Sequence, residues 1–138
     1  MIADSTIQLS ATWCILFLVG IRDEARLERQ IERVKRDLAL IGELRPGSLS
    51  TQYNVCGSPG CRCKADPPKK HGPYYQISYT RKGKSSTRFV RKEDLPNVRR
   101  QLKNYLRMKT LVERWVDLAT ELSTLRLTKE RGGASSSK

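Results

Sequence analysis

Residues 49–91, LSTQYNVCGSPGCRCKADPPKKHGPYYQISYTRKGKSSTRFVR, decide the fold of this chain. Side chains alternate between two faces over 49–55, 74–80 and 85–91, as they do in half-buried β-strands. A stretch rich in Gly and Pro separates the first two strands, and a Gly-containing turn at 81–84 separates the second from the third. We predict a three-stranded antiparallel sheet whose first connection is a long loop.

The long loop contains three cysteines and the single histidine of the chain: Cys56, Cys61, Cys63 and His71. Zinc prefers four thiolate or imidazole ligands in a tetrahedron. The glycines and the proline between Cys56 and Cys61 allow the backbone to curl, and nearby Lys and Arg favour the thiolate form. We therefore predict a zinc site that braces the sheet.

Another interpretation of this loop stays open. His71 can serve the turn at Gly72-Pro73, while the thiols are structural or redox-active, since reactive thiols also favour basic surroundings. The fourth cysteine, Cys14, lies in an apolar run and is expected to be a small buried hydrophobe. A close cluster of thiols favours a metal site over a disulfide framework and suggests a reducing, cytoplasmic location.

Helices are predicted on both sides of the sheet. Leu27, Ile31, Val34, Leu38 and Ile41 repeat at helical spacing and predict a helix over 22–44, ended by Arg45-Pro46-Gly47. A second helix is expected from a cap at Asp94 to about residue 126. The predicted fold class is α+β, with two long antiparallel helices flanking a small zinc-braced three-stranded antiparallel sheet.

The predicted domain organisation is simple. Residues 22–127 form a single domain, and 128–138, polar and rich in Gly and Ser, form a disordered tail. Residues 1–21 are an apolar extension, buried or disordered. Its nine-residue apolar run, Trp13–Ile21, is too short for a bilayer, which needs about 20 residues, so no membrane association is expected.

The charge is strongly positive and unevenly distributed. The chain of 138 residues has 27 basic and 14 acidic residues, a net charge of +13. Residues 81–114 hold twelve basic and three acidic residues, whereas 22–45 hold seven and six. A concentrated basic region favours a phosphate-backbone partner, DNA or RNA, over general solubility.

The sequence also indicates which side chains would contact nucleic acid. We expect the core face of the sheet to contain Tyr75, Ile77, Tyr79 and Phe89, which leaves an outward set on the hairpin and the second helix. The candidates are Tyr74, Arg81, Lys82, Lys84, Arg88, Arg91, Arg99, Arg100, Lys103 and Arg107. A solvated basic face is the ordinary alternative for the helical ones.

The chain resembles an uncharacterised family of small prokaryotic proteins in a series of motifs: Gly47-Ser-Leu-Ser, Cys56-Gly-Ser-Pro-Gly-Cys61-Arg-Cys63, His71-Gly-Pro-Tyr74-Tyr75, Gly83-Lys84 and a long basic helix. That family carries a domain of unknown function and is associated with mobile elements. The resemblance spans about residues 45–125. It implies an accessory factor of a mobile or virus-like element, and it implies no particular activity.

Three functions remain in competition. The first is a zinc-containing nucleic-acid-binding protein. The second is an oligomeric coiled-coil adaptor or assembly protein with a structural zinc tip, in which the long helices form a homo-oligomer. The third is an enzyme that uses a Cys thiolate or a Tyr as nucleophile and His71 as base. We do not expect an enzyme, because no orienting third residue or carboxylate cluster accompanies His71.

Overall fold

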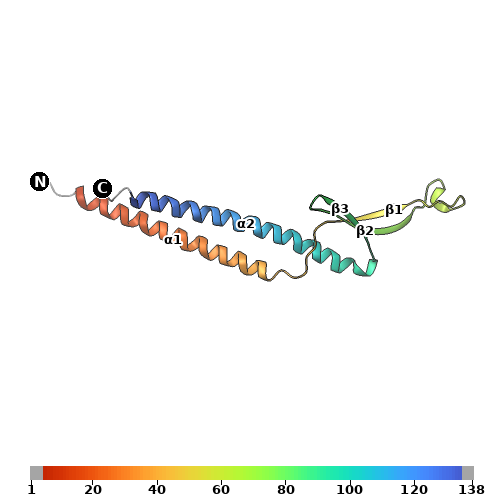
Figure 1. The fold of residues 1–138 in the computed structure, drawn as a ribbon, viewed down its shortest axis with the longest axis horizontal. Helices are drawn as coiled ribbons and strands as arrows, with labels where there is room; N and C mark the ends of the chain where they lie inside the picture. The colour runs from red at the N-terminus through yellow and green to blue at the C-terminus, as the bar shows by residue number, and fades with distance from the viewer. Residues whose placement is uncertain (1–4, 135–138) are drawn as a thin grey trace. The chain divides into compact units, whose positions relative to one another are not determined.

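The computed structural model describes the backbone of residues 5–134 and the side chains of residues 20–133. It contains helices α1 (Ser5–Ala39) and α2 (Leu95–Ala134), and strands β1 (Ser48–Asn54), β2 (His71–Arg81) and β3 (Lys84–Val90) (Figure 1). Short 3-10 helices at Arg62–Lys64 and Lys92–Asp94 lie in the connections. The predicted α+β class, with two helices and one three-stranded antiparallel sheet, is confirmed.

The chain divides into two compact units, which we describe separately. The helical unit comprises Met1–Leu40 and Met108–Lys138, and the sheet unit comprises Ile41–Arg107. Helix α2 contributes its first part to the sheet unit and the remainder to the helical unit. The boundaries of a single domain at 22–127 stay a prediction.

The helical unit is an antiparallel hairpin. Leu27, Ile31 and Val34 of α1 are buried against Leu118 and Leu122 of α2, so these residues of the predicted stripe do form the core, whereas Ile41 lies beyond the end of α1. Leu38 packs against this core and is partly buried. Two contacts show that the helices are antiparallel. Glu24, early in α1, pairs with Arg126, late in α2, whereas Lys35 lies over the ring of Trp115, 5.5 Å from its centre.

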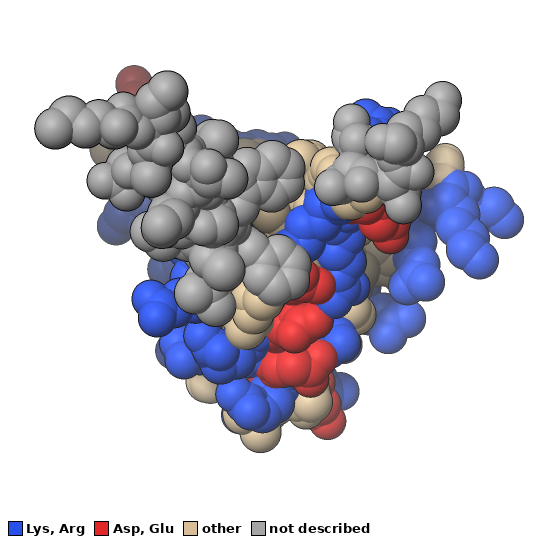
Figure 2. Space-filling model, turned by 90° about the vertical axis from the view of Figure 1, so that its left-hand side faces the viewer, with Lys and Arg blue, Asp and Glu red and all other residues tan. Residues whose placement is uncertain are grey.

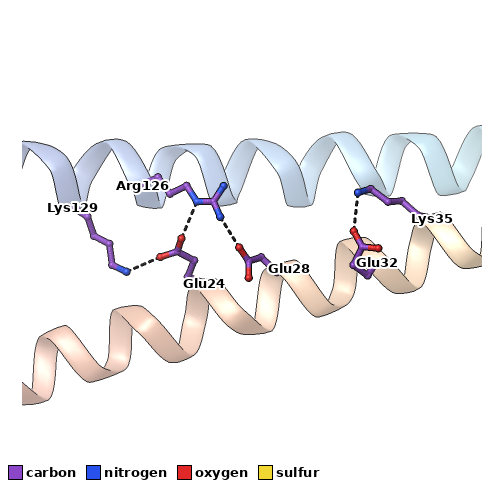
Figure 3. A network of polar contacts seen from close by, with 6 residues as sticks. All are labelled: Glu24, Glu28, Glu32, Lys35, Arg126 and Lys129. Atoms are coloured by element: carbon purple, nitrogen blue, oxygen red, sulfur yellow. Dashed lines mark hydrogen bonds and ion pairs between the residues drawn. The ribbon is translucent and has the colours of Figure 1, made fainter.

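Ion pairs join the two helices at one end of the hairpin. Arg126 donates to Glu24 at 2.8 Å and to Glu28 at 2.6 Å, and Lys129 donates to Glu24 at 2.6 Å (Figure 3). Hydrogen bonds from Lys129 and then Arg126 lower the pKa of Glu24. Figure 2 looks toward this end of the hairpin, where acidic and basic side chains lie next to one another.

The helix ends differ from the prediction. Helix α1 ends at Ala39 instead of residue 44, because the following segment bonds to α2: Arg45 donates its backbone N–H to the Gln101 carbonyl, and Asn104 donates to the Glu43 carbonyl. The segment contains Gly42, which weakens a helix. Helix α1 begins at Ser5 and includes the apolar run at 13–21. Whether the side chains of residues 1–19 are buried lies outside the described residues.

Helix α2 continues past its predicted end near residue 126 to Ala134. The predicted disorder of residues 128–134 is therefore wrong, since Thr128 donates to the Thr124 carbonyl and Lys129 bonds to Glu24 across the hairpin. The rest of the predicted tail, 135–138, lies outside the described residues. Over the described part of the chain, neither helix has a stretch apolar and long enough to cross a bilayer.

The sheet has the order β1-β2-β3 and is antiparallel throughout. The hairpin between β2 and β3 turns at Lys82 and Gly83, whose positive φ angles of 50° and 72° fit a two-residue type I′ turn. This short turn pairs Arg81 with Lys84, and the pairing then fixes the whole register of the hairpin.

The register corrects the predicted core face of the sheet. Ile77 pairs with Leu49 and Arg88, and it is buried, with 2% of its surface exposed. Phe89 pairs with Gln76, so it lies on the opposite face from Ile77 and is 71% exposed. The prediction that Phe89 belongs to the core face is wrong. The buried apolar residues of the sheet unit are few: Cys63, Ile77, Leu95 and Val98.

Candidate metal centre

The loop between β1 and β2 brings three cysteines and a histidine together. Cys56 follows the end of β1, Cys61 and Cys63 lie at the 3-10 turn Arg62–Lys64, and His71 is the first residue of β2. Backbone hydrogen bonds shape the turn: Cys61 N–H donates to the Ser58 carbonyl at 3.4 Å, and Lys64 N–H donates to the Cys61 carbonyl at 3.0 Å. This loop, residues 55–70, which we call the ligand loop, joins two paired strands, so the sheet fixes both of its ends.

The four side chains have the geometry of a tetrahedral metal site. Their ligand atoms all lie within 4.8 Å of one another. The Sγ atoms of Cys56 and Cys63 are 3.6 Å apart, and Cys61 Sγ lies 3.1 Å from His71 Nε2. Zinc–sulfur bonds of about 2.3 Å in a tetrahedron place two sulfurs about 3.8 Å apart. The Cys₃His cluster can therefore hold one metal ion.

The electrostatics of the cluster favour a bound cation. The Ser58 backbone N–H, followed by hydrogen bonds within the cluster, lowers the pKa of the Cys56 thiol to about 6. Cys63 accepts a hydrogen bond from the Cys56 backbone N–H at 3.4 Å, which lowers its pKa, but burial and the neighbouring thiols outweigh this and raise it. A divalent cation would stabilise this arrangement, in which the Cys56 thiol ionises readily and other sulfur atoms lie close to it.

Gly72 allows His71 to reach the cluster. Gly72 has a φ of +139°, and a Cβ atom there would lie 2.8 Å from the Gln52 carbonyl oxygen of β1. An L-residue rarely adopts this φ, so the position favours glycine for both conformation and space. The register of β1 and β2 shifts between Gln52 and Asn54, which leaves Asn54 paired with His71. This irregularity places the histidine at the mouth of the ligand loop.

The predicted nucleic-acid contacts all lie in the sheet unit, as does the cluster. Arg81, Lys82 and Lys84 surround the hairpin turn, and the basic residues of α2 occupy its first part. All ten candidates are exposed: Tyr74, Arg81, Lys82, Lys84, Arg88, Arg91, Arg99, Arg100, Lys103 and Arg107. Arg88 is exposed although it shares the sheet face of Ile77.

The excess positive charge belongs to the sheet unit. Ile41–Arg107 contain 15 basic and 4 acidic residues, net +11, whereas the helical unit contains 12 and 10, net +2. Among the described side chains, the five ion pairs all fall in the helical unit. The cations of the sheet unit thus lack carboxylate partners within the part of the chain that the structure describes.

Two residues outside the predicted set, Arg45 and Phe89, also lie on the surface of the sheet unit. Arg45 lines a hollow of about 230 Å³ together with Arg81, Arg88 and the apolar side chains of Pro46, Ile77 and Tyr79. No carboxylate belongs to this lining. In the sequence, the Pro-Gly pair after Arg45 indicates only a helix end. Phe89 is outside the predicted set because alternation alone assigned it to the core.

Comparison with known protein families relates the chain to one of unknown function. The model of a family described as a domain of unknown function, DUF6788, matches residues 24–100. The matched segment contains all three strands, the four residues of the cluster and the beginning of α2. No curated protein and no solved structure matches the chain.

Proposed function

Because the chain belongs to the DUF6788 family, whose function is unknown, we propose from its own residues that it is a zinc-stabilised nucleic-acid-binding protein. The observation that carries this proposal is the location of the charge: the unit that contains the Cys₃His cluster also holds +11 of the net charge of +13. The metal shapes the small sheet, and the sheet displays the cations.

Zinc is the metal that best fits the ligands. Three thiolates and one imidazole are soft or borderline donors, which suit zinc and disfavour magnesium or calcium. Four protein ligands fill a tetrahedron and leave no position for substrate water, as in structural zinc sites. The proposed ion is therefore structural, and we propose no enzymatic reaction at this cluster.

Nucleic acid is the partner that best fits the charge. Fifteen basic side chains within 67 residues repel one another, and the described carboxylates do not neutralise them. A polyanion removes this repulsion and releases its own condensed counterions on binding. The hollow between Arg45, Arg81 and Arg88 supplies a location for one phosphate, because guanidinium groups bind phosphate oxygens in a bidentate manner. We also propose that the protein is an accessory factor of a mobile or virus-like element.

Neutralising the hairpin turn tests this interface. The triple variant R81Q/K82Q/K84Q is expected to bind DNA and RNA oligonucleotides more weakly and with a smaller salt dependence. On duplex DNA, each lost phosphate contact reduces the slope of log K against log salt by about 0.9, so three contacts reduce it by about 2.7; on a single strand the reduction is about 0.7 per contact. Fluorescence anisotropy titrations between about 50 and 200 mM salt measure both quantities.

A matched control separates the interface from net charge. R29Q/R33Q/R36Q removes the same charge from exposed positions of α1 in the helical unit. This control variant is expected to keep the affinity and slope of the natural chain. If both variants lose the same affinity and slope, the effect comes from net charge alone and the hairpin turn is not the interface. If the natural chain binds no oligonucleotide at about 50 mM salt, the proposed function is refuted.

An oligomeric adaptor is the second candidate. It is favoured by exposed apolar side chains on α2 of the helical unit: Val112, Trp115 and Val116 are 39%, 37% and 58% exposed. A hairpin of two helices can bury such a stripe against a second hairpin, as in four-helix bundles. Light scattering of the chain with and without oligonucleotide distinguishes the candidates, since an adaptor forms the same oligomer in both conditions.

A further inference from the structure

Two aromatic rings are exposed on the sheet face that is opposite Ile77. Tyr74 is 43% exposed and Phe89 is 71% exposed. The register pairs Phe89 with Gln76 and Tyr75 with Val90, so Tyr74 and Phe89 are diagonal neighbours on one face of adjacent strands. Diagonal neighbours are about 7–8 Å apart between Cα atoms, within reach of one aromatic ligand.

The rest of this face is polar, so core packing does not explain the rings. Ser78 and Thr87 are hydrogen-bonded through their hydroxyls at 3.1 Å, and Thr80 and Ser85 at 2.8 Å. The Gln52 amide donates to the Ser50 hydroxyl at 3.4 Å on the neighbouring strand. The face therefore combines neutral hydroxyl and amide groups with a pair of uncovered aromatic rings.

A cation lies beside the two rings. Lys92 lines a hollow of about 370 Å³ together with Pro73, Tyr74, Tyr75, Phe89 and Val90, at the end of β3. Apart from the lysine, this lining consists of aromatic and aliphatic side chains. A flat apolar ring next to an anionic group is the ligand that complements such a surface, and a nucleotide has both parts.

We propose that this aromatic face binds unpaired bases of a single-stranded nucleic acid, which stack on Tyr74 and Phe89 while Lys92 contacts the adjoining phosphate. The inference rests on the proposed function and specifies its substrate class. Every base has an aromatic face, but in a duplex those faces are already stacked inside the helix. A second copy of the chain is a poorer occupant, because two sheet units, each with a net charge of +11, repel one another.

Substitutions of the exposed ring test the stacking. Phe89→Ala is expected to weaken binding of single-stranded RNA and DNA about 5- to 150-fold, the range for one lost base stack. Phe89→Leu keeps an apolar side chain and is expected to bind like Phe89→Ala, whereas Phe89→Tyr keeps the ring and is expected to bind like the natural chain. Leu106→Ala, a change at a 64% exposed apolar position on α2, is the matched control.

The oligonucleotide supplies the second arm of the test. The full chain is titrated with a single strand, a duplex of the same length and an abasic strand that keeps the phosphates. We expect the single strand to bind most tightly, and Phe89→Ala to affect neither the duplex nor the abasic strand. Comparing ribo- and deoxyribo-strands shows which sugar is preferred.

The outcomes separate this inference from the proposed function. If the chain binds single strand, duplex and abasic strand equally, and Phe89→Ala changes none of them, base stacking is excluded while nucleic-acid binding stands. If no oligonucleotide binds at low salt, both fail. If Phe89→Ala instead breaks an oligomer seen by light scattering, the face is an interface between copies and the inference is overturned.

Discussion

Replacing Cys63 with serine is expected to unfold the sheet unit while the helical hairpin stays folded. Cys63 is the most deeply buried of the four proposed ligands, with 1% of its surface exposed. A serine hydroxyl is a poor ligand for a soft metal site, so the variant loses the metal. Binding free energies of about 10–16 kcal/mol at structural zinc sites are free energies of folding, and little else stabilises this sheet.

The small core of the sheet unit explains why the effect is large. Its buried apolar side chains other than Cys63 are Ile77, Leu95 and Val98, and the face with Phe89 is open to water. A three-stranded sheet needs a hydrophobic face or a packed helix for independent stability. Four ligands from one loop and the first residue of β2 replace the core that this unit lacks.

Aromatic residues allow the two units to be followed separately. All five tyrosines lie in the sheet unit, whereas both tryptophans, Trp13 and Trp115, lie in the helical unit. In Cys63→Ser, the tyrosine bands of the near-ultraviolet circular dichroism are expected to disappear while Trp115 fluorescence is retained. Cys56→Ser, at a less buried position, is expected to lose the tyrosine bands in the same way, and Cys14→Ser, in the helical unit, is expected to keep them. A folded Cys63→Ser sheet unit without metal would contradict the structural role.

Replacing Gly72 with alanine is expected to prevent metal binding although no ligand is removed. The new Cβ would meet the Gln52 carbonyl oxygen at 2.8 Å and Tyr53 Cδ1 at 3.0 Å, so β1 or β2 must shift. The φ of +139° adds conformational strain of about 1–3 kcal/mol for an L-residue. Because His71 is the preceding residue, the shift moves the imidazole away from the three sulfurs.

A matched glycine in the same loop controls for this substitution. A Cβ at Gly60 would meet nothing within 4 Å, and Gly60 has no positive φ. Gly60→Ala is therefore expected to bind metal and melt like the natural chain, whereas Gly72→Ala is expected to lose the tyrosine signal of the folded sheet. Equal metal affinity in the two variants, measured by competition with a zinc indicator, would show that the backbone at Gly72 does not position His71.

The sequence was most informative where chemistry and alternation agreed. Three cysteines and one histidine within sixteen residues predicted a cluster, and the structure brings all four together because the strands on either side pair with each other. The strand pattern and the Gly-containing turn predicted the meander. The helical spacing of Leu27, Ile31 and Val34 predicted the stripe that forms the core of the hairpin.

Other features depend on contacts that a linear pattern does not contain. Alternation divides β3 into two faces, but only the two-residue turn at Lys82-Gly83 decides that Arg88, and not Phe89, shares the face of Ile77. Helix α1 ends early because Glu43 and Arg45 bond to a helix more than 50 residues later. Arg45 lines the same hollow as Arg81 and Arg88, although these residues are far from it in the sequence. Folding alone brings the three together.

Elemental analysis of the purified chain, repeated after exhaustive treatment with a chelator, tests the central claim most directly. We predict one zinc ion per chain before treatment, and loss of the tyrosine circular dichroism once the metal has been removed. A chain that is free of metal and still shows the full signal of a folded sheet would contradict it.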